Sequence, residues 1–236
     1  MSLTALQLVQ TAAGRMSITV PTALFSSTDQ QVIQLRNLLN EEGIALTRDP
    51  QVAWTCLMRE KTFLTTATEA QTNAIPADFS WYLNDTMWNR TQMVKVGGPA
   101  SPEEWQMLKS LAILSLPAAV FRFRDEDLLM YPTQAADQTC AYEYSTTYWV
   151  AGDKTYMTAD ADTTPLDDEV MILGIMWRFL QAKGLDYAEP FRNYELAKQN
   201  KIGRDGGKRK IYLGGGIPNP WNANIPTGGW PGSGNP

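Results

Sequence analysis

The 236-residue sequence contains no histidine, and this absence narrows the chemistry open to the protein. Histidine is the commonest general base in enzymes and a frequent metal ligand, so the absence excludes Ser-His and Cys-His nucleophile pairs and every metal site that uses histidine. Cysteine is scarce as well. Cys56 and Cys140 stand far apart without a CxxC motif, so they cannot form a zinc site by themselves, and we expect two reduced thiols because nothing indicates secretion.

Long apolar runs and an excess of basic charge are also missing. The longest apolar stretch, around VMILGIMWRFL, is about half a membrane span and contains Arg178, so no transmembrane helix is expected. The N-terminal MSLTALQLVQTAAGR has neither a basic n-region nor a long apolar run, which argues against a signal peptide. The net charge of -5 and the pI of about 4.9 argue against a dedicated nucleic-acid binder, although DNA could still pass nearby without sticking.

The remaining composition is that of a globular protein, with 44% apolar and 19% charged residues, so a hydrophobic core can form. Apolar residues at helical spacing predict a short helix over 2–15 and a second helix over 26–43. For the second helix we expect Thr28 as N-cap, Gln31 closing a capping box, and Gly43 in the left-handed position at the C-terminus.

The middle of the chain is rich in threonine, valine and aromatic residues, which favour strands. We expect strands over 52–75 and a hairpin over 119–132. In the following QTCAYEYSTTYWV, alternation places Cys140, Tyr142 and Tyr144 on one side of a strand.

A helix over 101–116 interrupts this β region. Ser101 is its expected N-cap, Pro102 its first helical residue, and Glu104 the residue that closes the capping box. Near the C-terminus EVMILGIMWRFLQAKG is apolar almost all round and should be buried, and a second long helix follows with Asp186 as a possible N-cap. Because no βαβ repeat appears, the order of elements predicts an α+β fold in which a helical core carries a β lobe.

The acidic segment ADADTTPLDDE offers a possible metal site. Asp160 and Asp162 form a DxD motif, and clusters of carboxylates can hold Mg²⁺ or Mn²⁺. The favoured interpretation is a helix start at Thr164–Asp167, because carboxylates in a first turn meet the positive end of the helix dipole, for roughly 0.3–1 kcal/mol each. We therefore predict no metal site, no cofactor and no catalytic residues.

A run of basic residues lies further along the sequence, C-terminal to the acidic segment, and includes Lys201 and Arg204. It could bind nucleic acid, or it could be a solvated helix end with cations near the C-terminal dipole, which is the favoured interpretation. A third interpretation is a contact between subunits, in which Lys201 and Arg204 of one copy face Asp160 and Asp162 of the next.

The last 23 residues, GGGIPNPWNANIPTGGWPGSGNP, contain twelve Gly or Pro residues and no charged side chain. Such a segment cannot build a helix or a core, yet it carries four large apolar residues. Burying a large aromatic side chain contributes roughly 1.5–3 kcal/mol, so we expect this tail to dock in a pocket of a partner. The predicted docking residues are Ile217, Trp221, Ile225 and Trp230. Five other tryptophans are predicted core residues: Trp54, Trp81, Trp88, Trp105 and Trp177. For Trp149 the sequence does not decide between a core and a surface position.

Several stretches together resemble the phage head-to-tail adaptor family, whose members join the portal to the tail. The resemblance covers roughly residues 20 to 205, and the order and spacing of the stretches carry it more than any single motif. They are DFSWYLNDTMWNR (78–90), GGPASPEEWQMLK (97–109), FRFRDEDLLMYP (121–132), YEYSTTYWV (142–150) and DEVMILGIMWRFLQAKGLDYAEPFRNYE (168–195).

The resemblance implies an α+β fold with a four-helix core, an inserted β-rich lobe and an extended C-terminal tail. The corresponding division is 1–50 for the N-terminal helices of the core, 51–165 for the β-rich insertion with its helix 101–116, 166–204 for the C-terminal helix pair, and 205–236 for the tail.

The resemblance also implies a structural virion protein without enzymatic activity. It would form a ring, typically of twelve subunits, below the portal, extend the DNA channel and provide the platform for tail proteins such as nozzle, tube or fibre. Genomic DNA would pass through the lumen without specific binding, and no membrane would be involved. The expected location is the neck of the virion, after assembly in the host cytoplasm, with the C-terminal tail reaching into the portal.

Two alternatives of other classes stay open on the sequence. The first is a DxD-type metal-dependent enzyme that uses Asp160 and Asp162. The second is a carbohydrate-binding β module with exposed tryptophans as sugar platforms, which the large helical share of the chain disfavours.

Overall fold

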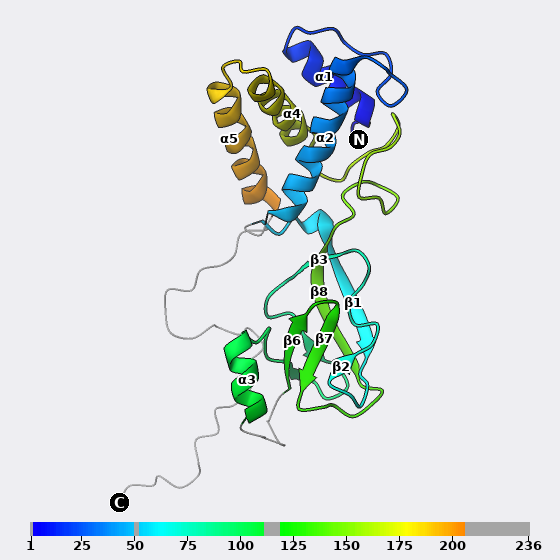
Figure 1. The fold of residues 1–236 in the computed structure, drawn as a ribbon, viewed down its shortest axis with the longest axis vertical. Helices are drawn as coiled ribbons and strands as arrows, with labels where there is room; N and C mark the ends of the chain where they lie inside the picture. Colours follow the sequence, from blue (N-terminus) through cyan, green and yellow to red (C-terminus); the bar gives the residue numbers. More distant parts are fainter. Residues whose placement is uncertain (1, 50–51, 111–118, 206–236) are drawn as a thin grey trace, which may run out of the picture.

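The computed structural model describes residues 2–49, 52–110 and 119–205, and all structural statements below concern these ranges. Within them the protein is a mixed α+β chain with five α-helices and two antiparallel sheets, which confirms the predicted fold class. The molecule is elongated, with four of the helices at one end and both sheets with the remaining helix at the other (Figure 1). We call residues 2–57 and 147–205 the helical end, and residues 58–146 the β lobe.

The helical end contains α1 (Ala5–Arg15), α2 (Gln30–Arg48), α4 (Asp168–Ala182) and α5 (Ala188–Asp205). One hydrophobic cluster draws side chains from all four helices, most of them Leu, Ile, Val and Ala. Helix α4 packs against α1, α2 and α5. Neighbours on three sides explain why its sequence is apolar almost all round. Gly184 follows its end with a positive φ of 68°.

Two predicted details of α2 are wrong. Its N-cap is Asp29 and not Thr28, because the Asp29 carboxylate accepts a hydrogen bond from the Gln31 N–H at 2.7 Å. Gly43 does not end the helix, which continues to Arg48. A Cβ on Gly43 would lie 2.4 Å from ring carbons of Trp149, so this glycine lets the indole pack directly on the helix backbone. Close packing, and not a left-handed cap, accounts for the residue.

The β lobe is built around β8 (Thr139–Thr146), which pairs with β1 (Met58–Leu64) on one side and with β3 (Phe79–Tyr82) and β4 (Trp88–Asn89) on the other. β5 (Val94–Lys95) extends this sheet beyond β4. A second sheet has the order β2 (Ala70–Gln71), β7 (Asp127–Tyr131), β6 (Val120–Arg124), and β6 and β7 form the predicted hairpin.

Aromatic side chains from both sheets form the core of the β lobe. Cys140, Tyr142 and Tyr144 are all buried in this cluster, which confirms the predicted alternation along β8. Tyr82 and Phe121 meet edge to face with ring centroids 5.1 Å apart, a favourable arrangement of two aromatic rings.

Helix α3 (Pro102–Ser110) belongs to the β lobe, and its capping box is confirmed. The Ser101 N–H donates to the Glu104 carboxylate at 2.8 Å, and the Glu104 N–H donates to the Ser101 hydroxyl at 3.2 Å. The remainder of the helix predicted over 101–116 lies outside the described residues. At the start of the predicted strand region 52–75, Val52, Trp54 and Leu57 pack in the helical cluster instead, so that part of the prediction is wrong.

The tryptophans divide between the two parts of the molecule. Trp54 and Trp105 are buried as predicted, and Trp149, which the sequence left open, is only 1% exposed. Trp88 is 42% exposed, so its predicted core position is wrong. The strand that holds Trp88 is two residues long and turns this side chain to the solvent face, while the neighbouring Asn89 is buried. Trp81 and Trp177 are half-buried.

Candidate assembly surfaces

The two carboxylates of the DxD motif fix loops of their own chain. Asp160 accepts hydrogen bonds from the backbone N–H groups of Leu24, at 3.2 Å, and Phe25, at 2.9 Å, and so ties the 158–162 turn to the connection between α1 and α2. Asp162 accepts from the Lys154 ammonium at 2.7 Å. The two side chains therefore serve different segments and do not converge on one point.

The electrostatics of Asp162 match this structural role. Burial alone would raise the pKa of its carboxyl group, but the hydrogen bonds from Lys154 and from the backbone N–H groups of Thr158 and Ala159 outweigh it and hold the pKa at about 2. Its side chain is only 9% exposed, which leaves little of it for an external partner. Throughout residues 2–49, 52–110 and 119–205 no three His, Cys, Asp or Glu side chains are grouped so as to hold a metal ion.

The acidic residues before and in the first turn of α4 mark a helix start, as the favoured interpretation predicts, and one of them caps the helix. Asp167 is the N-cap and accepts from the N–H groups of Glu169, at 3.1 Å, and Val170, at 3.2 Å. Asp168 accepts from the Leu3 N–H, and Glu169 pairs with Arg15 at 2.6 Å. The acidic cluster therefore fastens α4 to the N-terminal segment and to α1.

The basic residues of α5 also find partners within the chain. Lys201 lies 3.3 Å from the Asp167 carboxylate. Lys198 lies 2.8 Å from the Asp49 carboxylate. Arg204 is exposed in the last turn of α5. The structure thus places three of the four residues predicted at a subunit contact, Asp160, Asp162 and Lys201, in interactions with their own chain. The predicted portal-docking residues lie outside the described residues: Ile217, Trp221, Ile225 and Trp230.

A buried ion pair inside the helical end has no counterpart among the predictions. The Arg178 Nε of α4 donates to the Glu42 carboxylate of α2 at 2.7 Å, and Glu42 is completely buried. A Cβ on Gly174 would lie 2.3 Å from the Glu42 carboxyl carbon, so the glycine makes room for this carboxylate. Burial raises the pKa of Glu42, and the Arg178 guanidinium opposes the shift. The sequence feature that could have predicted this ion pair is an arginine within an almost wholly apolar helix, since a buried charge needs a partner.

The junction between the helical end and the β lobe is held by Arg59 at the start of β1. Its guanidinium donates to Asp78 of the lobe at 3.1 Å and to Asp153 of the helical end, and it lies 5.5 Å from the ring centroid of Tyr148. Two chain segments cross this junction, one leading into β1 and one leaving β8 (Figure 1). The Arg59 contacts therefore link the helical end and the β lobe beside the two chain segments that pass through the junction.

An exposed apolar surface lies where α4 turns into α5. Leu185 is 54% exposed, and Tyr187 and Phe191 are each more than a third exposed. The rings of Tyr187 and Phe191 lie 6.4 and 5.1 Å from that of Trp177. We call these four residues the aromatic knob.

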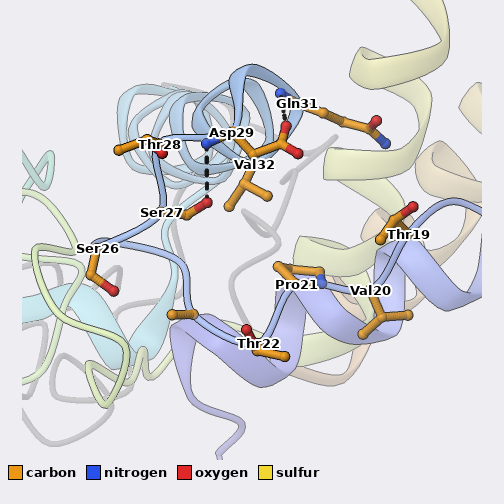
Figure 2. Close-up of a pocket in the computed structure, with 11 residues that line it drawn as sticks. Thr19, Val20, Pro21, Thr22, Ser26, Ser27, Thr28, Asp29, Gln31 and Val32 are labelled. Atoms are coloured by element: carbon orange, nitrogen blue, oxygen red, sulfur yellow. Dashed lines mark hydrogen bonds between the residues drawn. The ribbon is translucent and has the colours of Figure 1, made fainter.

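A hollow of about 530 Å³ lies on the connection between α1 and α2. Figure 2 shows Val20, Pro21 and Thr22 on one segment of the connection, Ser26 to Asp29 on the other, and Val32 pointing into the space between them. We call this the loop hollow, and its lining residues lie within 19–32.

No helix in the described ranges is long and apolar enough to cross a membrane.

A comparison with protein families aligns nearly the whole sequence with the model of one family. The model of a family described as SU10 adaptor protein matches residues 3–210, which include every described helix and strand. A search of curated proteins found no match.

Proposed function

Because the chain belongs to the SU10 adaptor family, a family of phage head-to-tail adaptors, we propose that it joins the portal of the capsid to the tail. The observation that carries this proposal is the family match over residues 3–210. The family consists of structural adaptors and not of enzymes, and the engagement of Asp160 and Asp162 by their own chain agrees with a structural role.

In the proposed assembly twelve copies form a ring directly below the portal. The helical end, with α1, α2, α4 and α5 as its four-helix core, forms the body of the ring, and the ring extends the DNA channel. The net charge of -5 supports a conduit through which DNA passes without specific binding, since like charges do not attract. The complex would occupy the neck of the virion after assembly in the host cytoplasm.

The charged contact between neighbouring subunits remains part of this proposal. Lys201 and Arg204 of one copy would face Asp160 and Asp162 of the next. Because Lys201, Asp160 and Asp162 already have partners in their own chain, we expect Arg204 to contribute most to such a contact.

The C-terminal segment 205–236 is the proposed portal-binding element, with Ile217, Trp221, Ile225 and Trp230 as its anchors. Its starting point is fixed. The Asp205 carboxylate accepts hydrogen bonds from the backbone N–H and the hydroxyl of Thr55, both at 2.8 Å, next to the junction with the β lobe. A segment that leaves from a fixed point can add a strand to a partner's sheet edge and use its large side chains for register.

The β lobe is the proposed platform for tail proteins, whether nozzle, tube or fibre. Its outer sheet face carries Trp88 beside the paired charges Glu60 and Arg90, whose side chains lie 2.7 Å apart. An exposed aromatic residue within a charged rim is the composition found at many protein interfaces.

The test is a binding experiment with the portal protein of the same phage. Cryo-EM and mass measurement of the mixture should show a ring of adaptor subunits on the portal. The Trp221→Ala/Trp230→Ala variant should lose portal binding, whereas Asn222→Ala/Asn224→Ala, changed in the same segment, should retain it. A portal complex that forms equally well with a chain ending at Asp205 would overturn the role of the segment, and no complex at all would overturn the proposed function.

A further inference from the structure

We propose that neighbouring subunits meet by inserting the aromatic knob of one copy into the loop hollow of the next. This inference rests on the proposed function, because it adds an apolar contact to the charged one between neighbouring subunits of the proposed ring. The occupant of the loop hollow is thus a second copy of this chain.

The aromatic knob has the properties of an interface anchor. Leu185, Tyr187 and Phe191 are exposed at the α4–α5 connection and in the first turn of α5, and Trp177 of α4 contacts the two rings. Contiguous exposed apolar patches are uncommon on monomeric proteins, and aromatic residues are enriched in the fully buried centres of protein interfaces. The rings of Tyr187 and Phe191 both contact Trp177, the ring of Phe191 also contacts Tyr194, and both side chains stay more than a third exposed.

The loop hollow is preformed. The Asp160 carboxylate holds the N–H groups of Leu24 and Phe25, and the Gln10 side-chain amide donates to the Pro21 carbonyl at 2.9 Å. At about 530 Å³ the hollow falls in the size range of pockets that bind drug-sized ligands, so it has room for an aromatic side chain.

The chemistry of the two surfaces is complementary. Val20, which is 47% exposed, lies with Pro21 and Val32 along the hollow and offers an apolar wall for a ring. Ser and Thr hydroxyls occupy the rest of the lining, and they can bond the hydroxyl of an inserted Tyr187. A tyrosine matches such a mixed lining because one end of its side chain is apolar and the other polar.

Charge agrees with the same pairing. Arg192 is exposed next to Phe191 on α5, and Asp29 lies on the lining of the hollow. Insertion of the knob would bring this cation towards that carboxylate. Opposite charges across an interface fix its register and disfavour wrong partners.

The positions of the two surfaces predict a ring and not a dimer. In Figure 1 the α4–α5 connection lies on the α5 side of the helical end, and the loop between α1 and α2 runs across the top of this end to its other side. A contact between two different surfaces of the same molecule repeats from copy to copy and closes into a ring when the rotation allows. Contact of the knob with itself would stop at two copies.

Disulfide trapping tests the geometry with small changes. Ala188 lies between Tyr187 and Phe191, and Thr28 lines the hollow. In a full-length background with Cys56→Ser, the double variant Thr28→Cys/Ala188→Cys should give a ladder of cross-linked species under mild oxidation, alone at high concentration or on the portal. Each single variant should give no ladder, and Thr28→Cys/Asn200→Cys, with its second cysteine about three turns further along α5, should cross-link at least tenfold less.

The outcomes separate this inference from the proposed function. A ladder without portal binding supports the contact and counts against the adaptor role. Portal binding without a ladder overturns the contact and leaves the adaptor role standing. Cross-linked dimers from Ala188→Cys alone show that the knob contacts itself, and protection of its thiol by portal or tail protein without a ladder shows a different occupant; each of these results also overturns the proposal.

A second variant tests the energetic role of the knob. Tyr187→Ala/Phe191→Ala should reduce the fraction of ring at a given concentration at least tenfold, measured as particle mass on the portal. Leu196→Ala is the matched control, because Leu196 is 53% exposed on the same helix but outside the knob. Unchanged circular dichroism in both variants shows that the fold is intact, and equal ring formation by both would contradict the proposal.

Discussion

The helical end and the β lobe each bury a carboxylate, but they satisfy it in different ways. In the β lobe Asp78 accepts hydrogen bonds from the hydroxyls of Tyr144, at 2.9 Å, and Thr146, at 2.7 Å, and from Arg59 at 3.1 Å. In the helical end Glu42 depends on Arg178, with a further interaction from Tyr194, and within the described residues its Oε1 has no hydrogen-bond partner.

The difference follows from the elements that carry the partners. Tyr144 and Thr146 both stand on β8, the strand that organises the lobe, so folding of one strand brings several donors to Asp78. The partner of Glu42 comes from a helix 136 positions away in sequence. The helical end therefore relies on groups from two other helices, Arg178 of α4 and Tyr194 of α5, whereas the lobe combines Arg59 with two hydroxyls from a single strand.

The largest effect should come from removing the cation of the helical end. Arg178→Leu leaves Glu42 as an uncompensated buried charge, which costs about 3–5 kcal/mol. Urea unfolding at pH 7 measures the loss. The control is Glu42→Leu/Arg178→Leu, which should recover most of it because two apolar residues can replace a buried pair. A double variant as unstable as the single one would show that packing, and not charge, holds α2 and α4 together.

The pH dependence of the same pair has a definite sign. Burial raises the pKa of Glu42 in the folded state above that of the unfolded chain, so the folded protein binds the proton more tightly. The resulting stabilisation is fully present below the unfolded pKa and is lost as the pH rises through the folded pKa. Arg178→Leu removes the opposing effect of the cation. The stability gap between Arg178→Leu and the double variant should therefore be smaller at pH 5 than at pH 7.5.

The corresponding change in the β lobe should have a smaller effect. Asp78→Ala leaves the hydroxyls of Tyr144 and Thr146 without their acceptor, and an unsatisfied buried group costs about 1–3 kcal/mol. Asp153 is the other carboxylate partner of Arg59, and its side chain is 65% exposed. Asp153→Ala should therefore lower the free energy of unfolding by less than about 1 kcal/mol.

Burial together with the hydrogen bond to Asp78 raises the pKa of Tyr144 to about 12. Loss of the carboxylate should lower this value, which an ultraviolet titration can follow. If Asp78→Ala destabilised the protein as much as Arg178→Leu, the contrast between the two regions would fail.

The sequence was sufficient for features that depend on neighbouring residues. The capping box at Ser101 and Glu104, the hairpin at 119–132 and the alternation along β8 are all local patterns, and the structure confirms them. The capping role of the acidic segment before α4 was predicted for the same reason, because a helix start needs only a few adjacent residues.

Features set by distant packing could not be predicted in this way. Gly43 matched a C-cap, but Trp149, 106 positions later, occupies the space beside it within a continuous helix. Trp88 resembled a core residue, but the side chain that a short strand buries depends on its register with β8. The aromatic knob and the loop hollow likewise become surfaces only when α4, α5 and the α1–α2 connection are folded.

Helix caps give a smaller test of the comparison. Asp167→Ala, in the helical end, should cost about 1–2 kcal/mol, because Asp167 accepts two backbone hydrogen bonds and contacts Lys201. Ser101→Ala, in the lobe, should cost about 0.5–1 kcal/mol, because its hydroxyl accepts one.

Thr28→Ala is the matched control for both, and it should be nearly neutral because Asp29 caps α2. Thermal unfolding of the three variants side by side ranks them. A loss at Thr28→Ala equal to that at Asp167→Ala would restore Thr28 as the cap.

The smallest effect on stability should come from Trp88, the exposed tryptophan of the lobe. Trp88→Ser should change the free energy of unfolding by no more than about 0.5 kcal/mol, because surface substitutions away from packed groups usually do little. Trp105→Ser, at a site only 2% exposed in the same lobe, should cost about 3 kcal/mol or more. If the lobe is the platform for tail proteins, Trp88→Ser should nevertheless weaken tail attachment to preformed portal–adaptor complexes while ring formation stays unchanged. A large stability loss at Trp88→Ser would instead return this residue to the core, and a loss of ring formation would assign its face to the neighbouring subunit, so the two measurements together decide what the solvent face of the β lobe contacts.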